Sequence, residues 1–369
     1  MPLSIGIVGL PNVGKSTLFN ALSSAAAEAA NYPFCTIEPN MGVVPVPDPR
    51  LDRIAELIRP RKKTPTALEF VDIAGLVRGA SRGEGLGNQF LANIRQVDAV
   101  LHVLRCFQDE NVTHVEAGLD PRRDKEVVET ELCLKDLETV ERRRERAQKA
   151  AKASGKQGEE ARAELALLDR VRERLDRGIP ARAMGLSDEE RTQLGELFLL
   201  TAKPVLYAAN IGESQLSSVG ADPHVQAVRA MAAQEGAEVV VLAAGIEAEI
   251  QQLRPEERDS FLASVGLREP ALSQVVRAGY RLLGLQTFFT LGDEECRAWA
   301  IKRGWKAPQA AGLVHTDFER GFIKAEVIRW QDLLQQGSEA AARDRGLMRV
   351  EGKDYVVQDG DCIHFRFHA

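Results

Sequence analysis

The stretch Gly9–Thr17, which reads GLPNVGKST, fits the pattern G-x-x-x-x-G-K-[ST] and decides the fold class. It follows the short β-branched segment Ser4–Val8 and precedes apolar residues at helical spacing. Strand, glycine-rich loop and helix form the context in which this pattern is a phosphate-binding loop, so a chance glycine turn is a poor alternative. The glycines let successive N–H groups point at phosphate oxygens, and the helix that starts at Lys15 adds the positive end of its dipole.

The residue types within this loop predict individual roles. Lys15 places a positive charge on the β- and γ-phosphates, and the Ser16 hydroxyl completes the coordination shell of Mg²⁺. Asn12 is a candidate ligand for a monovalent cation such as K⁺, which would substitute for an arginine finger. The predicted nucleotide-binding residues of the loop are Asn12, Val13, Gly14, Lys15, Ser16 and Thr17.

A second acidic motif follows the apolar strand Leu68–Val71. Asp72 stands at its carboxyl end, where α/β sheets bind ligands, and is placed to hold Mg²⁺. Gly75 is close enough for its N–H to reach a γ-phosphate, and the glycine-rich residues 79–87 are expected to order around a triphosphate. Thr36 is the candidate for a second hydroxyl ligand to Mg²⁺.

The base pocket is expected at the end of a later strand. Guanine-specific proteins of this class carry N-K-x-D there, whereas this chain has Asn210-Ile211-Gly212-Glu213. A displaced carboxylate forfeits a charged hydrogen bond of ~1.5–3 kcal/mol, or roughly 10- to 100-fold of guanine preference. Adenine instead offers a donor that Asn210 or a main-chain carbonyl accepts, which favours ATP over GTP. Ala243, Ala244 and Gly245 are predicted to lie against the base; a plain turn after the strand is the alternative.

The sequence also bears on hydrolysis. Leu76 stands where many relatives of this class place a water-orienting glutamine, so basal turnover is expected to be slow. Lys15 and Gly75 are predicted to stabilise the transferring phosphoryl group. His114 is the candidate for the missing water-orienting group, with a structural role as the alternative, and Arg78 and Arg82 are candidate charge donors.

The rest of the chain divides into regions that differ in the pattern of their apolar and charged residues. Residues 1–121 and 200–283 alternate short apolar strands with helices and predict a mostly parallel α/β sheet, with the pair Met41–Val46 and Leu68–Val71 antiparallel at one edge. Residues 122–199 contain no strand pattern. Two segments rich in Arg, Glu and Leu lie on either side of residues 153–158 and predict an inserted antiparallel helical hairpin with about 26 residues in each arm. Ordinary packed surface helices are the alternative. Residues 284–369 predict a small α+β domain, with helices expected at Cys296–Lys302 and Ile328–Gln335.

Composition excludes several classes of protein. Apolar residues make up 44% of the 369 residues and charged residues 28%, which argues against disordered and fibrous classes. The five cysteines show no metal-ligand spacing and are expected to be reduced thiols. With no apolar run of membrane-spanning length, we expect a cytoplasmic protein without a membrane partner, and a monomer.

These motifs together resemble the YchF/Obg-like ATPase family of translation-factor-related P-loop proteins. The resemblance covers essentially the whole chain and rests on Gly9–Thr17, Asn31–Asn40, Asp72–Leu76, Asn210–Glu213, Lys306–Gly312 and His315–Glu326. It implies an Obg-type G domain interrupted by a helical hairpin, a C-terminal ubiquitin-like (β-grasp) TGS domain, slow Mg²⁺-dependent hydrolysis of ATP in preference to GTP, and association with ribosomes. Leu76 matches a hydrophobic residue of the family, and His114 matches a loop histidine proposed to act in hydrolysis.

Two alternatives to this function stay open at the level of sequence. One is a conventional GTP-specific GTPase of the same fold. The other is an adaptor for ribosomes or RNA, in which nucleotide only orders the fold. Residues 141–177 hold 12 basic and 8 acidic residues, which suits contact with rRNA phosphates or, equally, a solvated helix face.

Overall fold

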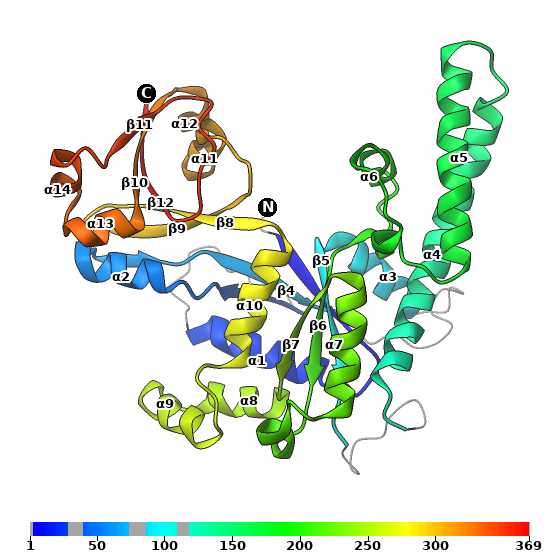
Figure 1. The fold of residues 1–369 in the computed structure, drawn as a ribbon, viewed down its shortest axis with the longest axis horizontal. Coiled ribbons are helices and arrows are strands. Elements are labelled where there is room, and N and C mark those ends of the chain that lie inside the picture. The colour runs from blue at the N-terminus through cyan, green and yellow to red at the C-terminus, as the bar shows by residue number, and fades with distance from the viewer. Residues whose placement is uncertain (1–2, 29–39, 74–85, 109–117, 369) are drawn as a thin grey trace.

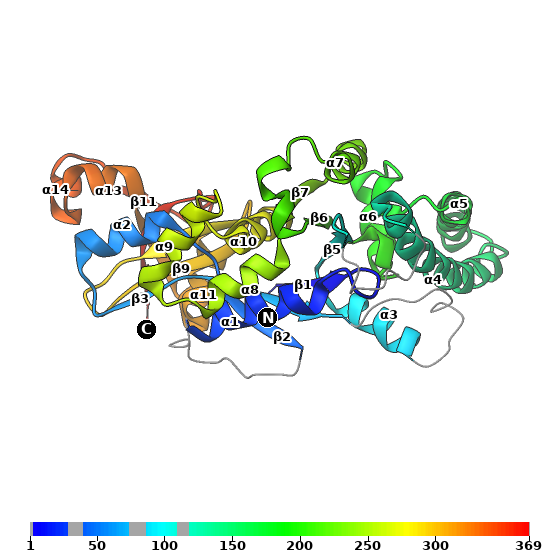
Figure 2. The ribbon, with the colours of Figure 1, turned by 90° about the horizontal axis from the view of Figure 1, so that it is seen from below.

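The computed structural model describes residues 3–28, 40–73, 86–108 and 118–368 of the chain. Its described residues form three parts in a row (Figures 1 and 2). A central α/β layer lies between a helical arm at one end and a smaller α+β part at the other. No helix in these ranges is both long and apolar enough to cross a bilayer.

The central sheet has six strands in the order β2-β4-β1-β5-β6-β7. Neighbouring strands are parallel except for β2 and β4, which pair antiparallel at the edge, as the sequence predicted. The strands β1, β5 and β6 are buried along their whole length, which explains their continuous apolar sequences. The bounds are β1 Ser4–Val8, β2 Met41–Pro45, β4 Ala67–Asp72, β5 Ala99–Arg105, β6 Val205–Asn210 and β7 Glu238–Leu242.

Helices cover this sheet and place its loops. Helix α1 contacts β1, β2 and β4, and α7 and α10 contact β6 and β7. Because β1, β4, β5, β6 and β7 run parallel, the loops that follow them meet at one edge of the sheet. The helices of this part are α1 Lys15–Glu28, α3 Leu86–Gln96, α7 Pro223–Glu235, α8 Ala244–Gln252, α9 Pro255–Ser264 and α10 Ala271–Leu282. Helix α2 (Pro49–Ile58) follows β2 in the chain, but it packs against the C-terminal part.

The inserted arm is an antiparallel pair of helices, α4 (Pro121–Ala150) and α5 (Lys156–Asp176) (Figure 1). Its seam is apolar and includes Val140, Leu168 and Val171. The helices are unequal, 30 and 21 residues, where two arms of about 26 were expected. The difference arises because the first turns of α4 pack on β5 and α7. The chain returns to β6 through η2 (Ala181–Ala183), α6 (Asp188–Gly195) and η3 (Leu200–Ala202).

The C-terminal part is built on a second six-stranded sheet, in the order β11-β10-β12-β8-β9-β3. Helices α11 and α13 pack on it through β10. The strands from this region are β8 Leu285–Thr290, β9 Glu295–Lys302, β10 Phe322–Arg329, β11 Arg349–Glu351 and β12 Asp361–Phe367, and the helices are α11 Ala307–Val314, α12 Thr316–Arg320, α13 Trp330–Gln336 and α14 Glu339–Asp344.

Two helix predictions in this part need correction. The segment Cys296–Lys302 is not helical but belongs to β9, which pairs antiparallel with β8. Burial alternates along its first half, with Cys296 and Ala298 inside, and this period of two is that of a strand. Over Ile328–Gln335 the helix begins only at Trp330, because Ile328 is still part of β10.

The sixth strand of this sheet comes from the central part of the chain. Strand β3 (Lys62–Thr64) pairs parallel with β9, so the two parts share one hydrogen-bonded ladder. A side-chain contact joins them as well, because the Arg50 guanidinium bridges Asp48, at the start of α2, to Asp359 in the C-terminal part at 2.8 and 2.7 Å.

Candidate functional site

The phosphate loop between β1 and α1 has the backbone that its glycines predict. Gly9, Asn12 and Gly14 all adopt positive φ, at 153°, 62° and 96°. At Gly9 a Cβ atom would lie 2.6 Å from the main-chain oxygen of Val103, so no side chain fits there. At Gly14 it would collide with the side-chain amide of Asn210. Sequence and fold thus agree on a tight, inward-curled loop at the carboxyl edge of the sheet.

Lys15 lies at the centre of this loop with only 7% of its surface exposed. Its ammonium group donates to the main-chain oxygen of Leu10 at 2.7 Å. Burial lowers the pKa of Lys15 to about 8, and the nearby charge of Asp72 opposes that shift. A buried cation with one neutral partner is ready to receive an anionic ligand.

Ser16 and Asp72, two residues that the sequence predicts as Mg²⁺ ligands, lie together beside the loop. Ser16 Oγ is 3.4 Å from Asp72 Oδ2. Asp72 Oδ1 is buried, and no hydrogen-bond partner for it exists among the described residues. Burial raises the pKa of Asp72, which Lys15 and Ser16 partly offset. An unsatisfied carboxylate oxygen next to a hydroxyl fits a hard cation such as Mg²⁺, which prefers oxygen ligands.

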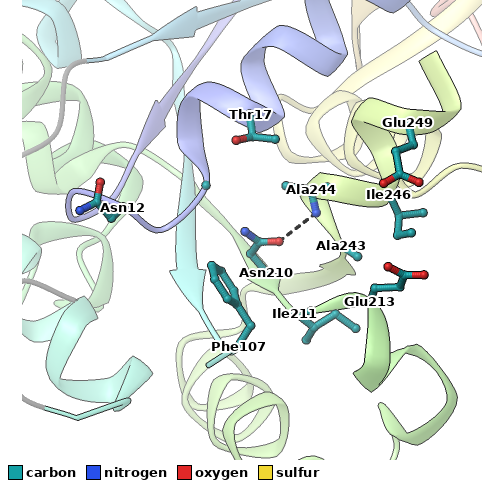
Figure 3. Close-up of a pocket in the computed structure, with 13 residues that line it drawn as sticks. Asn12, Thr17, Phe107, Asn210, Ile211, Glu213, Ala243, Ala244, Ile246 and Glu249 are labelled. Atoms are coloured by element: carbon teal, nitrogen blue, oxygen red, sulfur yellow. Dashed lines mark hydrogen bonds between the residues drawn. The ribbon is translucent and has the colours of Figure 1, made fainter. Parts of the chain in front are cut away.

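Asn210, at the end of β6, has a role that the sequence did not predict. Its side-chain nitrogen donates to the main-chain oxygen of Val13 at 2.9 Å, and its side-chain oxygen accepts from the N–H of Ala244 at 3.0 Å (Figure 3). The residue is buried, at 3% exposure. Asn210 thus joins the phosphate loop and the first turn of α8 to the end of β6.

A cavity of about 450 Å³ lies beside the phosphate loop, a size suited to a nucleoside. Figure 3 shows Asn210, Ile211 and Ala244 around the end of β6 and the start of α8, with Thr17 on α1 and Asn12 farther away on the phosphate loop. The predicted residues Asn12, Gly14, Thr17, Asn210, Ile211, Glu213, Ala243, Ala244 and Gly245 all line it, joined by Phe107, Gly212, Ile246 and Glu249. The structure therefore brings the phosphate-loop and base-loop predictions to one pocket.

Phe107 is the lining residue with the clearest chemical meaning among those that the sequence prediction missed. It follows the carboxyl end of β5, and its ring faces the guanidinium of Arg105 at 4.5 Å. Its position directly after a strand, at the edge of the sheet where ligands bind, could have indicated a pocket residue. An apolar residue at that position is equally typical of a strand that continues. An aromatic face in a base pocket suits stacking.

Gln215 fixes the shape of the base loop. Its side-chain oxygen accepts from the N–H of Gly212 at 2.8 Å, and its nitrogen donates to the main-chain oxygen of Cys106 at 2.9 Å and to Asp222. The loop that carries Glu213 is thereby tied to the segment that carries Phe107. Thr36, Leu76, Gly75, His114, Arg78 and Arg82 lie outside the described residues.

Two family models match parts of the chain, one in the central part and the first helix of the arm, the other in the C-terminal part. Residues 4–140 match the family model described as "50S ribosome-binding GTPase" (MMR_HSR1), and residues 285–368 match YchF-GTPase_C, described as a protein of unknown function. Two full-length relatives, each named ribosome-binding ATPase YchF, are 52% identical in Bacillus subtilis and 53% in Escherichia coli O157:H7, over 100% of both chains.

A solved structure agrees over the same extent. The YchF GTPase of Schizosaccharomyces pombe is 36% identical, covers 99% of this chain and 97% of its own, and superposes with a TM-score of 0.90. The likeness therefore extends over the central part, the arm and the C-terminal part together. On sequence, fold and site geometry, the chain belongs to the YchF family.

Proposed function

We propose that the chain binds and slowly hydrolyses ATP, in preference to GTP, with Mg²⁺, and that it does so as a nucleotide-dependent switch on ribosomes. A phosphate loop of the P-loop class and membership of the family support nucleotide hydrolysis in general. The preference for ATP rests on one observation, the base loop Asn210–Glu213, which lacks the Lys and Asp of guanine-specific proteins. The names of the bacterial relatives support the ribosome as the partner.

The chain's own residues divide the work. Lys15 and the main-chain amides of the phosphate loop bind the β- and γ-phosphates. Phe107 stacks on the base, and the buried Ile211 closes the apolar side of the pocket. Ser16, Asp72 and Thr36 are the proposed holders of Mg²⁺, which neutralises charge on the phosphates when bound. Gly75 and His114 remain the proposed γ-phosphate and water-orienting groups, and Asn12 the proposed ligand for K⁺.

We further propose the functional division that the sequence suggests: a nucleotide domain of residues 1–121 and 200–283, an arm of 122–199 and a TGS domain of 284–369. In this division the nucleotide domain binds and hydrolyses the nucleotide, and the arm and the last domain supply surfaces that contact the ribosome. The protein is proposed to work as a cytoplasmic monomer.

Competition binding tests this function. Purified full-length chain is titrated with labelled ATP in Mg²⁺, displaced by unlabelled ATP or GTP, and the series is repeated with purified ribosomal subunits. We expect ATP to displace at lower concentration than GTP, and binding to subunits to depend on nucleotide. If GTP bound a hundredfold more tightly, the chain would be a conventional GTPase. If the K15A variant lost turnover but still co-sedimented with ribosomes as the parent does, the adaptor alternative would replace the switch.

A further inference from the structure

A second cavity, which we name the arm-root pocket, lies where the arm joins the central sheet. Its volume is about 530 Å³, and its walls come from η2, α6, η3 and the residues just before β5 and β6. Asp98 and Pro204 mark the amino ends of those two strands. The pocket therefore opens at the sheet edge opposite the nucleotide site, and it shares no lining residue with that site.

Phe198, on the wall of this pocket, has a strained backbone conformation and an apolar side chain exposed to solvent. Its φ is +48°, and it follows closely on the last residue of α6, Gly195. A left-handed residue just after a helix is normally glycine or asparagine, because a Cβ atom is strained there. The side chain is nonetheless 65% exposed, so burial does not offset the strain. Strained residues that persist on a surface cluster at ligand clamps.

The walls of the pocket are apolar, and its charge is positive. Six of the twelve lining residues are leucine, alanine or proline, and the charged ones are three basic side chains, Arg182, Arg191 and Lys203, against one carboxylate, Asp98. Arg191 donates to the main-chain oxygen of Leu186 at 3.1 Å, and Lys203 donates to the main-chain oxygens of Arg95, at 3.2 Å, and Val97. Within the described ranges neither cation has a carboxylate within salt-bridge distance, and the charge of Asp98 acts on Lys203 only from farther away. A partner that brings a carboxylate is therefore complementary.

We propose that the arm-root pocket docks a protein segment that inserts an aliphatic side chain beside Phe198 and sets an adjacent Asp or Glu against Arg191 and Lys203. The pocket fits a polypeptide better than RNA for two reasons. Its walls accept an apolar side chain, and it offers two unpaired cations rather than the row of cations that follows a phosphate backbone. This proposal is independent of which nucleotide the chain binds.

Two pools of fluorescein-labelled octapeptides test the pocket, one with Asp-Leu-Asp fixed at the centre and one with Lys-Leu-Lys. We expect the full-length chain to bind the acidic pool at least tenfold more tightly than the basic pool. The F198G variant should weaken that binding by about 10-fold or more, the loss expected for one apolar side-chain contact. It should also raise the unfolding temperature, because glycine adopts positive φ without strain. R191E should shift preference towards the basic pool.

Matched controls keep the result specific. V350A removes a comparably exposed apolar side chain elsewhere, and R229E reverses a comparable surface charge; neither should alter peptide binding. Unaltered ATP affinity in F198G separates this test from that of the proposed function. The proposal is overturned if neither pool binds in a Phe198-dependent way, if F198G lowers the unfolding temperature, or if a single-stranded oligouridine competes for the pocket and F198G abolishes its binding.

Discussion

The side-chain nitrogen of Asn210 lies 2.9 Å from the main-chain oxygen of Val13, a residue 197 positions earlier in the chain. Through this bond the end of β6 holds the phosphate loop, and through its side-chain oxygen the same residue holds the first turn of α8. Three segments that carry proposed nucleotide contacts are therefore coupled in the structure itself.

N210A should consequently weaken both phosphate and base binding. Two hydrogen bonds are lost, and buried main-chain groups of Val13 and Ala244 are left without those partners, at a cost of about 2–3 kcal/mol. We expect ATP affinity to fall by roughly 30- to 150-fold in calorimetric titration. N20A, an exposed change on α1, is the control and should bind ATP as the parent does. ATP binding of N210A at the parental affinity would contradict the joining role.

Nucleotide binding should take up a proton at alkaline pH. Burial holds the pKa of Lys15 at about 8, below the 10.5 of an exposed lysine, and an anionic phosphate will raise it again. Near pH 9 the free protein has mostly lost this proton and the complex regains it, whereas near pH 6.5 both are protonated. Calorimetry in two buffers of different ionisation enthalpy measures the uptake. The K15M variant, which cannot titrate, should show no uptake at pH 9 from this position.

The same pKa sets a trend in stability. Between pH 8 and 10.5 the unfolded chain binds more protons at Lys15 than the folded chain does, so the contribution of this residue to stability rises with pH across that window. Urea unfolding of the parent and of K15M at pH 7.5 and 9.5 isolates the effect. The difference in unfolding free energy between the two proteins should change in favour of the parent at the higher pH.

D72N should change stability and metal binding in opposite directions. The carboxylate of Asp72 is desolvated and its Oδ1 lacks a partner among the described residues, so replacing the charge should stabilise the metal-free protein by about 1 kcal/mol. The variant should nonetheless lose most of the gain in ATP affinity that Mg²⁺ gives the parent. Urea unfolding in EDTA and ATP titration with and without Mg²⁺ measure the two effects.

D52N is the matched control for that change, because Asp52 is an exposed carboxylate paired with Lys63 on the protein surface. It should leave the Mg²⁺ dependence of ATP binding intact. Equal Mg²⁺ dependence in D72N and the parent would remove Asp72 from the metal site.

Among the ion pairs of the described residues, we expect those at the root of the arm to cost the most unfolding free energy when one partner is removed. Arg182 pairs with Glu129 and with Glu235, and Lys125 pairs with the same two carboxylates. All four side chains are at most 16% exposed. R182M leaves two buried carboxylates short of a partner and should lower the unfolding free energy by about 3–5 kcal/mol in urea.

R177M provides the comparison, since Arg177 forms an exposed pair with Glu173 four residues away. Such a pair contributes about 0.5 kcal/mol or less, so R177M should unfold nearly as the parent does. Similar losses in the two variants would mean that the buried cluster contributes no more than a surface pair.

The sequence predicted those parts of the site that local pattern determines. The phosphate loop, Ser16 and Asp72 were found because spacing and strand context fix them within a few residues. The pocket residues Phe107, Ile246 and Glu249 were missed because they meet only when β5 and α8 are brought together. The bond between Asn210 and Val13 could not be predicted because the two residues are remote in sequence, and the base contact of Asn210 stays a prediction.

The fold shows the same difference between elements that local sequence predicts and elements that depend on a partner strand far away in the chain. The central strands were predicted from continuous apolar runs, including the antiparallel edge pair. Cys296–Lys302 is a strand although its sequence predicts a helix, because a short amphipathic stretch suits either period and its pairing with β8 decides the outcome. Strand β3, with three residues, carries no pattern of its own and exists only through its partner β9.

The shared ladder between β3 and β9 means that the last 86 residues do not form a closed module. A fragment cut at Gly284 would expose one edge of β9 to solvent and invite self-association, whereas a fragment that also supplied Lys62–Thr64 would not. Only Pro65 and Thr66 separate β3 from β4, and β4 ends at the carboxylate Asp72. A shift of β4 along its axis would therefore reach Asp72 at one end of the strand and, across Pro65 and Thr66, the border strand β3 at the other.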